Sequence, residues 1–254
     1  SNNINGVGKV TKDDVYTMDK HGGLLPIQEA MVEKIVSELK GFENIVYEIC
    51  NEPYFGGVKM EWQHHIASLI SETEKKLGVR HLISQNIAND SARIMNPHPD
   101  ISVFNFHYAS PPIAVKQNYH LNKVIGNNET GFRGQKDSTY RKEGWEFILA
   151  GGALYNNLDY SFTANHESGT FVYPEKQPGG GSVSLRKQLG YLKKFMDSFD
   201  FVRMKPDNTL IKGGLPKETR AYVLSEAGKQ YAIYLLHGNQ VNLSLSLPTG
   251  VYHA

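Results

Sequence analysis

The stretch that decides the fold is NIVYEICNEP, residues 44–53, an apolar run that ends on Asn51, Glu52 and Pro53. The β-branched and aromatic residues of its first half predict a buried strand. Proline cannot continue a β-ladder, so we expect the strand to end at Glu52. Because Asn and Glu are rarely buried without partners, their place at this end predicts a site for polar chemistry.

Strands and helices alternate along the middle of the chain. Ile27, Met31, Ile35 and Leu39 recur at helical spacing and predict an amphipathic helix over 25–39. We expect further helices over 62–77, 140–150 and 183–198, strands over 44–52, 81–85, 101–108, 123–129 and 153–160, and a loop carrying Asn86, Asn89 and Asp90. This alternation predicts parallel strands joined by crossover helices, which is an α/β fold.

Each of the five predicted strands ends in polar or aromatic residues. These ends are Asn51-Glu52, Gln85-Asn86, His107-Tyr108, Asn128-Glu129 and residues 157–160. In a (β/α)8 TIM barrel the carboxyl ends of all strands share one face, and that face carries the chemistry. We therefore expect these residues to converge on one substrate mouth.

The pattern changes after Asp207. The segments TRAYVLSE and KQYAIYLLHG, separated by residues 227–229, predict an antiparallel hairpin, and VNLSLSLPTG alternates with period two. We expect a catalytic domain over residues 1–205 and part of an all-β sandwich module over 206–254. Residues 1–24 are expected to form a long loop.

Composition excludes several classes of function. The 254 residues carry 27 Lys and Arg against 26 Asp and Glu, a formal net charge of +1, so a nucleic-acid partner has no electrostatic support. The longest apolar runs are far shorter than the roughly 20 residues that a bilayer requires, so we expect no membrane partner. Cys50 is the single cysteine, and neither an HExxH motif nor a Cys/His cluster is present. We expect no metal and no cofactor.

Two strand ends together carry a family resemblance. NIVYEICNEP, followed later by KVIGNNETG at residues 123–131, resembles strands four and seven of the clan A retaining glycoside hydrolases, the 4/7 superfamily. Among these, the chain is most similar to bacterial members with a C-terminal β-domain of the type described as collagen-binding. The resemblance implies that only barrel strands four to eight are present here. Either the chain is then a fragment, which the missing strands could leave inactive, or the barrel is completed by something outside it, and the resemblance implies a secreted or periplasmic protein.

The resemblance also implies roles for individual residues. Retaining hydrolysis needs two carboxyl groups about 5–5.5 Å apart. Glu52 matches the acid/base, Glu129 the nucleophile, and Asn51 the residue that binds the sugar 2-hydroxyl. Tyr108, with His107 beside it, matches the position that hydrogen-bonds the nucleophile, and which of the two faces the site stays open. Further substrate-binding candidates are Asn86, Asn128, His166 and Tyr173.

Some alternatives remain open at this point. Glu48 shares one side of its strand with Glu52 and is the rival carboxylate, although a structural role paired to an Arg or Lys is favoured. The loop over 163–182, which contains His166 and Tyr173, is expected either to form an aromatic wall for a sugar or to be a surface flap. The function expected is cleavage of O-glycosidic bonds in poly- or oligosaccharides with retention. The alternative is a noncatalytic carbohydrate-binding protein on a degenerate barrel.

Overall fold

A computed structural model of the chain describes residues 6, 8–18, 23–174, 179–238 and 240–253. The chain divides into two compact units. The first unit contains residues 1–88, 92–106 and 121–124, and the second contains 89–91, 107–120 and 125–254. Among the described residues, no helix is both long and apolar enough to cross a membrane.

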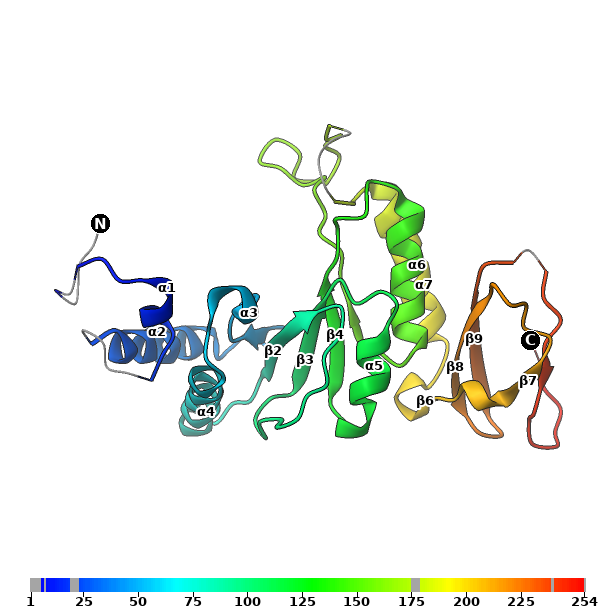
Figure 1. Ribbon diagram of the computed structural model, residues 1–254, viewed down its shortest axis with the longest axis horizontal. Helices are drawn as coiled ribbons and strands as arrows, with labels where there is room; N and C mark the ends of the chain where they lie inside the picture. Colours follow the sequence, from blue (N-terminus) through cyan, green and yellow to red (C-terminus); the bar gives the residue numbers. More distant parts are fainter. Residues whose placement is uncertain (1–5, 7, 19–22, 175–178, 239, 254) are drawn as a thin grey trace. The chain divides into compact units, whose positions relative to one another are not determined.

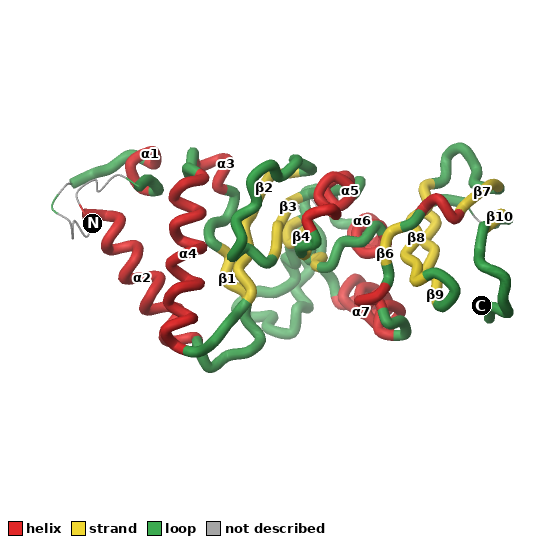
Figure 2. The backbone as a smooth tube through the Cα atoms, turned by 90° about the horizontal axis from the view of Figure 1, so that it is seen from below, coloured by secondary structure: helices red, strands yellow, loops and turns green. Residues whose placement is uncertain are grey.

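The first unit is built from helices and the first strands of a sheet. Its elements are α1 (Lys12–Val15), α2 (Leu24–Leu39), β1 (Val46–Glu48), α3 (Pro53–Gly56), α4 (Met60–Leu77), β2 (Leu82–Asn89) and most of β3 (Val103–His107). Helices α2 and α4 lie side by side (Figure 2). The helices predicted over 25–39 and 62–77 are therefore confirmed, whereas α1 and α3 were not foreseen.

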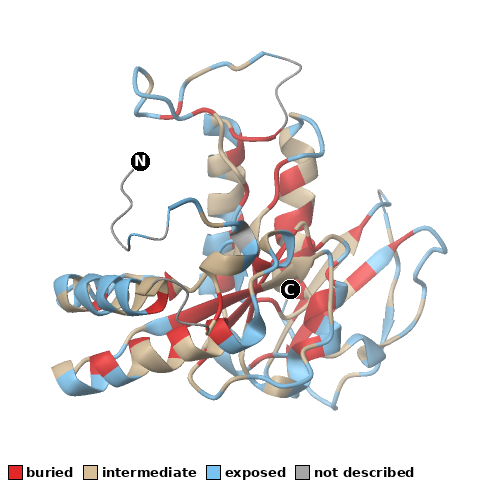
Figure 3. Cartoon of the chain, turned by 60° about the vertical axis from the view of Figure 1, so that its left-hand side comes forward, coloured by how far each residue is buried: buried red, intermediate tan, exposed pale blue. Residues whose placement is uncertain are grey.

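Helix α2 does not bury its predicted apolar stripe. Ile27, Met31 and Ile35 are 38, 56 and 43% exposed, and Figure 3 shows the exposed positions in pale blue. The buried residues of the helix are Leu25 and Val36, and the Trp62 indole nitrogen of α4 donates to the Gln28 side-chain oxygen at 3.0 Å. The buried side of the helix therefore differs from the one that its periodicity predicted.

Strands β1 to β5 form one sheet in chain order, and the pairs β1–β2 and β4–β5 are parallel. β1 is shorter than predicted and ends at Glu48, although the Ile49 amide still donates to the Ser84 carbonyl at 3.1 Å. Glu52 therefore lies beyond the strand and precedes α3. β2 is longer than predicted, so Asn86 lies inside a strand and not in a loop.

The second unit contains the rest of the sheet and a smaller antiparallel part. Its elements are α5 (Ile113–Asn118), η2 (Tyr119–Leu121), β4 (Val124–Glu129), α6 (Asp137–Leu149), β5 (Leu154–Tyr155), α7 (Val183–Asp197), η3 (Phe201–Arg203), β6 (Lys205–Pro206), η4 (Asn208–Leu210), β7 (Ile211–Gly213), β8 (Arg220–Glu226), β9 (Gln230–Leu236) and β10 (Ser244–Leu245). Two of these boundary residues, Leu121 and Val124, cluster with the first unit. The predicted helices over 140–150 and 183–198 are confirmed as α6 and α7, which run side by side (Figure 1).

Strand β5 is much shorter than the strand predicted over 153–160. After Tyr155 the chain continues beside β4 irregularly, with the Leu158 amide donating to the Thr130 carbonyl at 2.7 Å. The Tyr160 amide then donates to the Gly180 carbonyl at 3.2 Å. A Cβ at Gly180 would lie 2.3 Å from the Tyr140 ring, so only glycine allows this close approach. The three glycines at 179–181 are buried.

The antiparallel part confirms the predicted hairpin. β8 and β9 pair in register from Arg220 with Leu236 to Glu226 with Gln230, and β6 adds to β8. β7 and β10 form a separate two-stranded pair. One hydrophobic core joins the three-stranded sheet to α6 and α7; its buried members are Leu149, Leu192, Met196, Met204, Leu224 and Ala232. The architecture is thus a parallel sheet with helices, consistent with part of a (β/α)8 barrel, followed by antiparallel sheets.

Candidate active site

In the second unit, Glu129 is the last residue of β4 and makes a close pair with Tyr108, which follows β3. The Tyr108 hydroxyl donates to Oε1 of Glu129 at 2.5 Å, and the Tyr108 amide donates to the Glu129 carbonyl at 2.7 Å. The buried His107 places Nδ1 3.7 Å from Oε2 of the same carboxylate. Of the two candidates that the sequence left open, Tyr108 therefore makes the short hydrogen bond, and it orients one carboxylate oxygen.

The backbone at Tyr108 is in an unusual conformation. Its φ is 53°, in the left-handed region, which costs a residue with a bulky side chain about 1–3 kcal/mol and is common at functional sites. Phe132 packs edge-on against the Tyr108 ring with centroids 5.8 Å apart, and it is 55% exposed. An exposed aromatic ring thus lies beside the Tyr108–Glu129 pair. Sequence reasoning missed Phe132, although it follows the Asn-Glu-Thr-Gly segment directly.

In the first unit, Glu52 stands at the turn between β1 and α3. Its φ of 45° is also left-handed, and its amide donates to the side-chain oxygen of the buried Asn86 at 3.1 Å. The Tyr54 hydroxyl lies 3.4 Å from Oε1 of Glu52, at the long end of hydrogen-bonding distance. Tyr54 packs against Phe55 with ring centroids 5.0 Å apart, and Phe55 is exposed. Asn86 therefore acts in this unit as a support for the backbone of Glu52.

Glu48, the rival carboxylate, has a different environment. Its Oε2 accepts a hydrogen bond from the Ser84 hydroxyl at 3.0 Å and from the Asn105 amide at 2.6 Å. Both donors are buried residues of the neighbouring strands β2 and β3. Neutral donors thus hold this carboxylate between strands, and they satisfy the polar group that the sheet would otherwise bury at a cost.

The remaining asparagines have more ordinary surroundings. Asn51 is exposed, and its carbonyl lies 3.5 Å from the Cys50 sulfur. Cys50 is half-buried, and burial raises the pKa of its thiol, which disfavours the reactive thiolate. The carbonyl of Asn128 accepts a hydrogen bond from the Asn156 side chain at 3.0 Å. Asn51 and Asn128 directly precede the two glutamates in sequence, and these contacts assign no role to their side chains.

The segment after β5 is anchored by Arg186 of α7. The guanidinium donates to Oδ2 of Asp159 at 2.6 Å, to the Ser161 hydroxyl at 2.8 Å and to the Gly169 carbonyl at 2.8 Å. Its central carbon lies 4.6 Å from the Phe162 ring centroid, within range of a cation–π interaction. One arginine therefore fixes the start of the long segment that sequence analysis placed over 163–182.

His166 and Tyr173 lie in that segment, but each contacts its own neighbours. The His166 ring packs against Phe171 with centroids 5.3 Å apart. The Tyr173 hydroxyl lies 3.4 and 3.3 Å from the carbonyls of Gly179 and Gly181, and burial raises its pKa. Tyr173 thus supports the backbone with its hydroxyl. Residues 175–178 of the loop predicted over 163–182 lie outside the described residues.

Buried carboxyl groups of α6 contact Thr130, the residue after Glu129, and neighbouring arginines, and no sequence pattern predicts this network. Glu143 of α6 accepts hydrogen bonds from the Thr130 hydroxyl at 2.7 Å and from Arg133 at 3.1 Å. Burial raises the pKa of Glu143, while the hydrogen bond from Thr130 and the charge of Arg133 lower it. Similarly, burial raises the pKa of Glu146, which contacts Arg220 at 2.8 Å.

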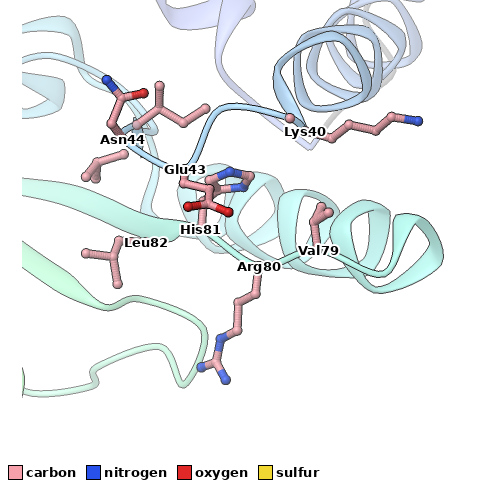
Figure 4. A pocket seen from close by; sticks show the side chains of 10 residues that line it. Lys40, Glu43, Asn44, Val79, Arg80, His81 and Leu82 are labelled. Carbon is pink, nitrogen blue, oxygen red and sulfur yellow. The ribbon is translucent and has the colours of Figure 1, made fainter.

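The first unit also has an open pocket of about 740 Å³ at the amino-terminal ends of β1 and β2 (Figure 4). It is lined by residues 40–41, 43–46 and 79–82. The side chains of Lys40 and Arg80 extend away from the other labelled side chains in Figure 4. Since Glu52 follows the carboxyl end of β1, the pocket at the amino end is a separate feature.

Comparisons with known proteins give a limited result. No protein-family model matches the chain, and no curated protein matches it either. Among solved structures, a GH128 (subgroup II) endo-β-1,3-glucanase from Pseudomonas viridiflava matches with 10% sequence identity and a TM-score of 0.38. The match covers 63% of this chain and 73% of that protein. A similarity at this level carries no argument about the function of this chain.

Proposed function

We propose that this chain is part of a retaining glycoside hydrolase that cleaves O-glycosidic bonds in poly- or oligosaccharides. Glu129 is the nucleophile, and Glu52 is the general acid and then the general base of a double displacement. The proposal includes a catalytic region over residues 1–205 and a β-sandwich-type module over 206–254. It also includes secretion or export to the periplasm, which a carbohydrate substrate outside the cell would require.

The observation that carries the proposal is the hydrogen bond from Tyr108 to Glu129 at the end of β4. A carboxylate nucleophile must present one oxygen in a fixed direction, and a hydrogen bond to the other oxygen fixes its rotamer. Oε1 receives the Tyr108 hydroxyl, so Oε2 is the oxygen proposed to attack the anomeric carbon. The neighbouring His107 supplies a second polar group on that side.

Glu52 supports the second role by its position. It directly follows β1, a strand that pairs in parallel with β2, and active sites of barrel enzymes lie at the carboxyl ends of such strands. Its left-handed backbone, held by Asn86, turns the residue out of the strand direction. A general acid needs a fixed place beside the leaving oxygen, and this support provides one for Glu52.

The surfaces beside the two glutamates fit a sugar. Exposed aromatic rings accompany each of them, namely Tyr54 and Phe55 near Glu52 and Phe132 near the Tyr108–Glu129 pair. Aromatic faces match the C–H faces of pyranose rings and remain available to a substrate. A net charge of +1 over 254 residues agrees with a neutral ligand. We therefore propose carbohydrate as the partner, without a cofactor.

Two variants assayed in the full-length protein test the assignment. Glu129→Gly should stop turnover of every arylglycoside, because no nucleophile remains. Glu52→Ala should still form the glycosyl-enzyme from substrates with a good leaving group, but its hydrolysis should be slow. Azide should then give a glycosyl azide of retained configuration with Glu52→Ala and of inverted configuration with Glu129→Gly, measured by proton NMR. Glu33→Ala, which changes an exposed carboxylate of α2, is the matched control and should behave like the wild type.

The possible outcomes separate the alternatives. Exchanged azide configurations would require the roles of Glu52 and Glu129 to be exchanged. If Glu48→Gln abolished turnover while Glu52→Ala left hydrolysis intact, the acid/base would be Glu48. Oligosaccharide binding without turnover by the wild-type protein would contradict the hydrolase and favour a noncatalytic carbohydrate-binding protein.

A further inference from the structure

Arg133 connects the loop after β3, which contains Tyr108, to the segment that follows Glu129 at the end of β4. Its guanidinium donates to the Ser110 hydroxyl at 3.2 Å and to the Ser110 carbonyl at 3.0 Å, in the loop after β3. The same guanidinium donates to Oε1 of Glu143 at 3.1 Å, and Arg133 itself lies in the loop after β4. The planar fork of arginine allows these contacts to be made together, which a lysine ammonium cannot reproduce.

Glu143 continues the connection to the nucleophile's neighbour. Its Oε2 accepts the Thr130 hydroxyl at 2.7 Å, so each carboxylate oxygen has its own partner. Glu143 and Thr130 are almost fully buried, with 4 and 1% exposure. The Arg133 backbone is fixed as well, because its amide donates to the hydroxyl of the buried Tyr140 at 3.1 Å. The Thr130–Glu143 hydrogen bond is buried and fixes positions more strongly than an exposed one, whereas the Arg133 side chain is 49% exposed.

Both ends of this connection lie next to the candidate catalytic pair. Thr130 directly follows Glu129, and the Ser110 amide donates to the Tyr108 carbonyl at 2.8 Å. Tyr108 has a left-handed backbone, and such a conformation persists only when the surrounding contacts hold it. The route Ser110–Arg133–Glu143–Thr130 therefore restrains the Tyr108 loop and the Glu129 strand end relative to each other.

We infer that Arg133 and Glu143 are positioning residues, which keep the Tyr108 hydroxyl aligned on the Glu129 carboxylate through Ser110 and Thr130. The part of this inference that concerns catalysis rests on the proposed function, whereas the alignment of Tyr108 on Glu129 does not. Neither residue needs to touch the substrate for this role. If the network had a purely structural role, its removal would destabilise the fold but leave the Tyr108–Glu129 hydrogen bond unchanged.

The test measures the Tyr108–Glu129 hydrogen bond directly. The hydroxyl proton of Tyr108 is followed by NMR and is assigned by its loss in Tyr108→Phe. In Arg133→Met, which removes three partly exposed hydrogen bonds, its exchange with water should be about tenfold faster than in the wild type, a factor that corresponds to about 1.4 kcal/mol of lost support. Arg133→Lys should recover only part of the protection. Arg141→Met is the matched control. Arg141 of α6 donates to Gln188 at 2.8 Å, so its replacement should leave the exchange rate of the Tyr108 hydroxyl proton unchanged.

Kinetics of the full-length protein complete the experiment. If the proposed function holds, Arg133→Met should lower kcat by up to about 100-fold with little change in KM, because misaligned catalytic groups affect the transition state most. Thr130→Val removes only the hydroxyl that binds Glu143, and it serves in place of Arg133→Met if that variant does not fold. It should change the same NMR signal in the same direction.

The outcomes distinguish this inference from the proposed function. If the Tyr108 hydroxyl proton exchanged with water at the wild-type rate in folded Arg133→Met and Thr130→Val, the positioning role would be overturned, whatever the activity. Accelerated exchange in both variants, together with turnover that does not depend on Glu129, would support the positioning role and contradict the proposed nucleophile. Accelerated exchange together with a selective loss of kcat would support both.

Discussion

Replacing Arg186 by methionine should open the segment that follows β5 without unfolding the protein. Arg186 holds Asp159, Ser161 and Gly169 through three hydrogen bonds of 2.6–2.8 Å. Methionine keeps the length and apolar part of the side chain but has no donor. The segment carries His166 and Tyr173, so its order bears directly on their proposed contact with substrate.

The size of the effect follows from the burial of the ion pair. The side chains of Arg186 and Asp159 are 32 and 18% exposed. Exposed pairs contribute about 0.2–1 kcal/mol, whereas breaking a buried pair costs about 3–5 kcal/mol. A partly buried pair lies between these limits, so we expect a loss of about 2 kcal/mol. At about 1.4 kcal/mol per factor of ten, the open state of the segment becomes about 30-fold more populated.

Hydrogen exchange measures this opening at named amides. The amides of His166, Gly169 and Phe171 donate within the segment to the carbonyls of Thr163, His166 and Ser161 at 2.9–3.0 Å. Their exchange should become about 30-fold faster in Arg186→Met, while amides of α6 keep their wild-type rates. The matched control, Arg141→Met, removes an arginine with a single neutral partner and should leave all of these rates unchanged.

Two results would contradict a local anchoring role for Arg186. Unchanged exchange at the three amides would mean that Arg186 does not anchor the segment. Equal acceleration in the segment and in α6 would mean that the ion pair contributes to global stability, and not to local order.

Three further predictions concern other parts of the molecule. The pKa of Glu143 is raised in the folded state, so the wild-type protein loses stability as pH rises from about 4.3 through the folded pKa. Glu143→Gln does not titrate at this position and should therefore become more stable relative to the wild type over that window. Urea unfolding at several pH values measures the difference. Parallel stability curves would contradict this. Leu224→Ala, in the core shared by β8, α6 and α7, should cost about 3 kcal/mol of unfolding free energy by the same method, whereas the exposed Leu245→Ala should cost less than about 0.5 kcal/mol. Equal costs would mean that the sheet does not share this core. Phe132→Ala should raise KM for oligosaccharides about fivefold and leave kcat unchanged, because ~1 kcal/mol of aromatic contact with the substrate is lost. The control Phe201→Ala changes another exposed ring and should leave KM unchanged. An unchanged KM in Phe132→Ala would exclude Phe132 from the binding surface.

Local patterns in the sequence were sufficient for many of the elements. The helical spacing over 25–39 and 183–198 located α2 and α7, because intrahelical hydrogen bonds join residues four apart. Period-two alternation around the turn at 227–229 located the β8–β9 hairpin for the same local reason. The sequence also marked Glu129 and Tyr108 as strand-end residues, and both lie at strand ends in the structure.

Only the tertiary structure decided which partners these elements meet. Leu25 and Val36 are the buried residues of α2 while Ile27, Met31 and Ile35 are exposed, and strand pairing set the ends of β1, β2 and β5. The network of Arg133 and Glu143 joins residues from two loops and a helix, so no short pattern could announce it. The physical reason is that a helix or a hairpin satisfies its backbone from nearby residues, whereas a sheet edge, a helix face and a buried carboxylate are satisfied by residues distant in sequence.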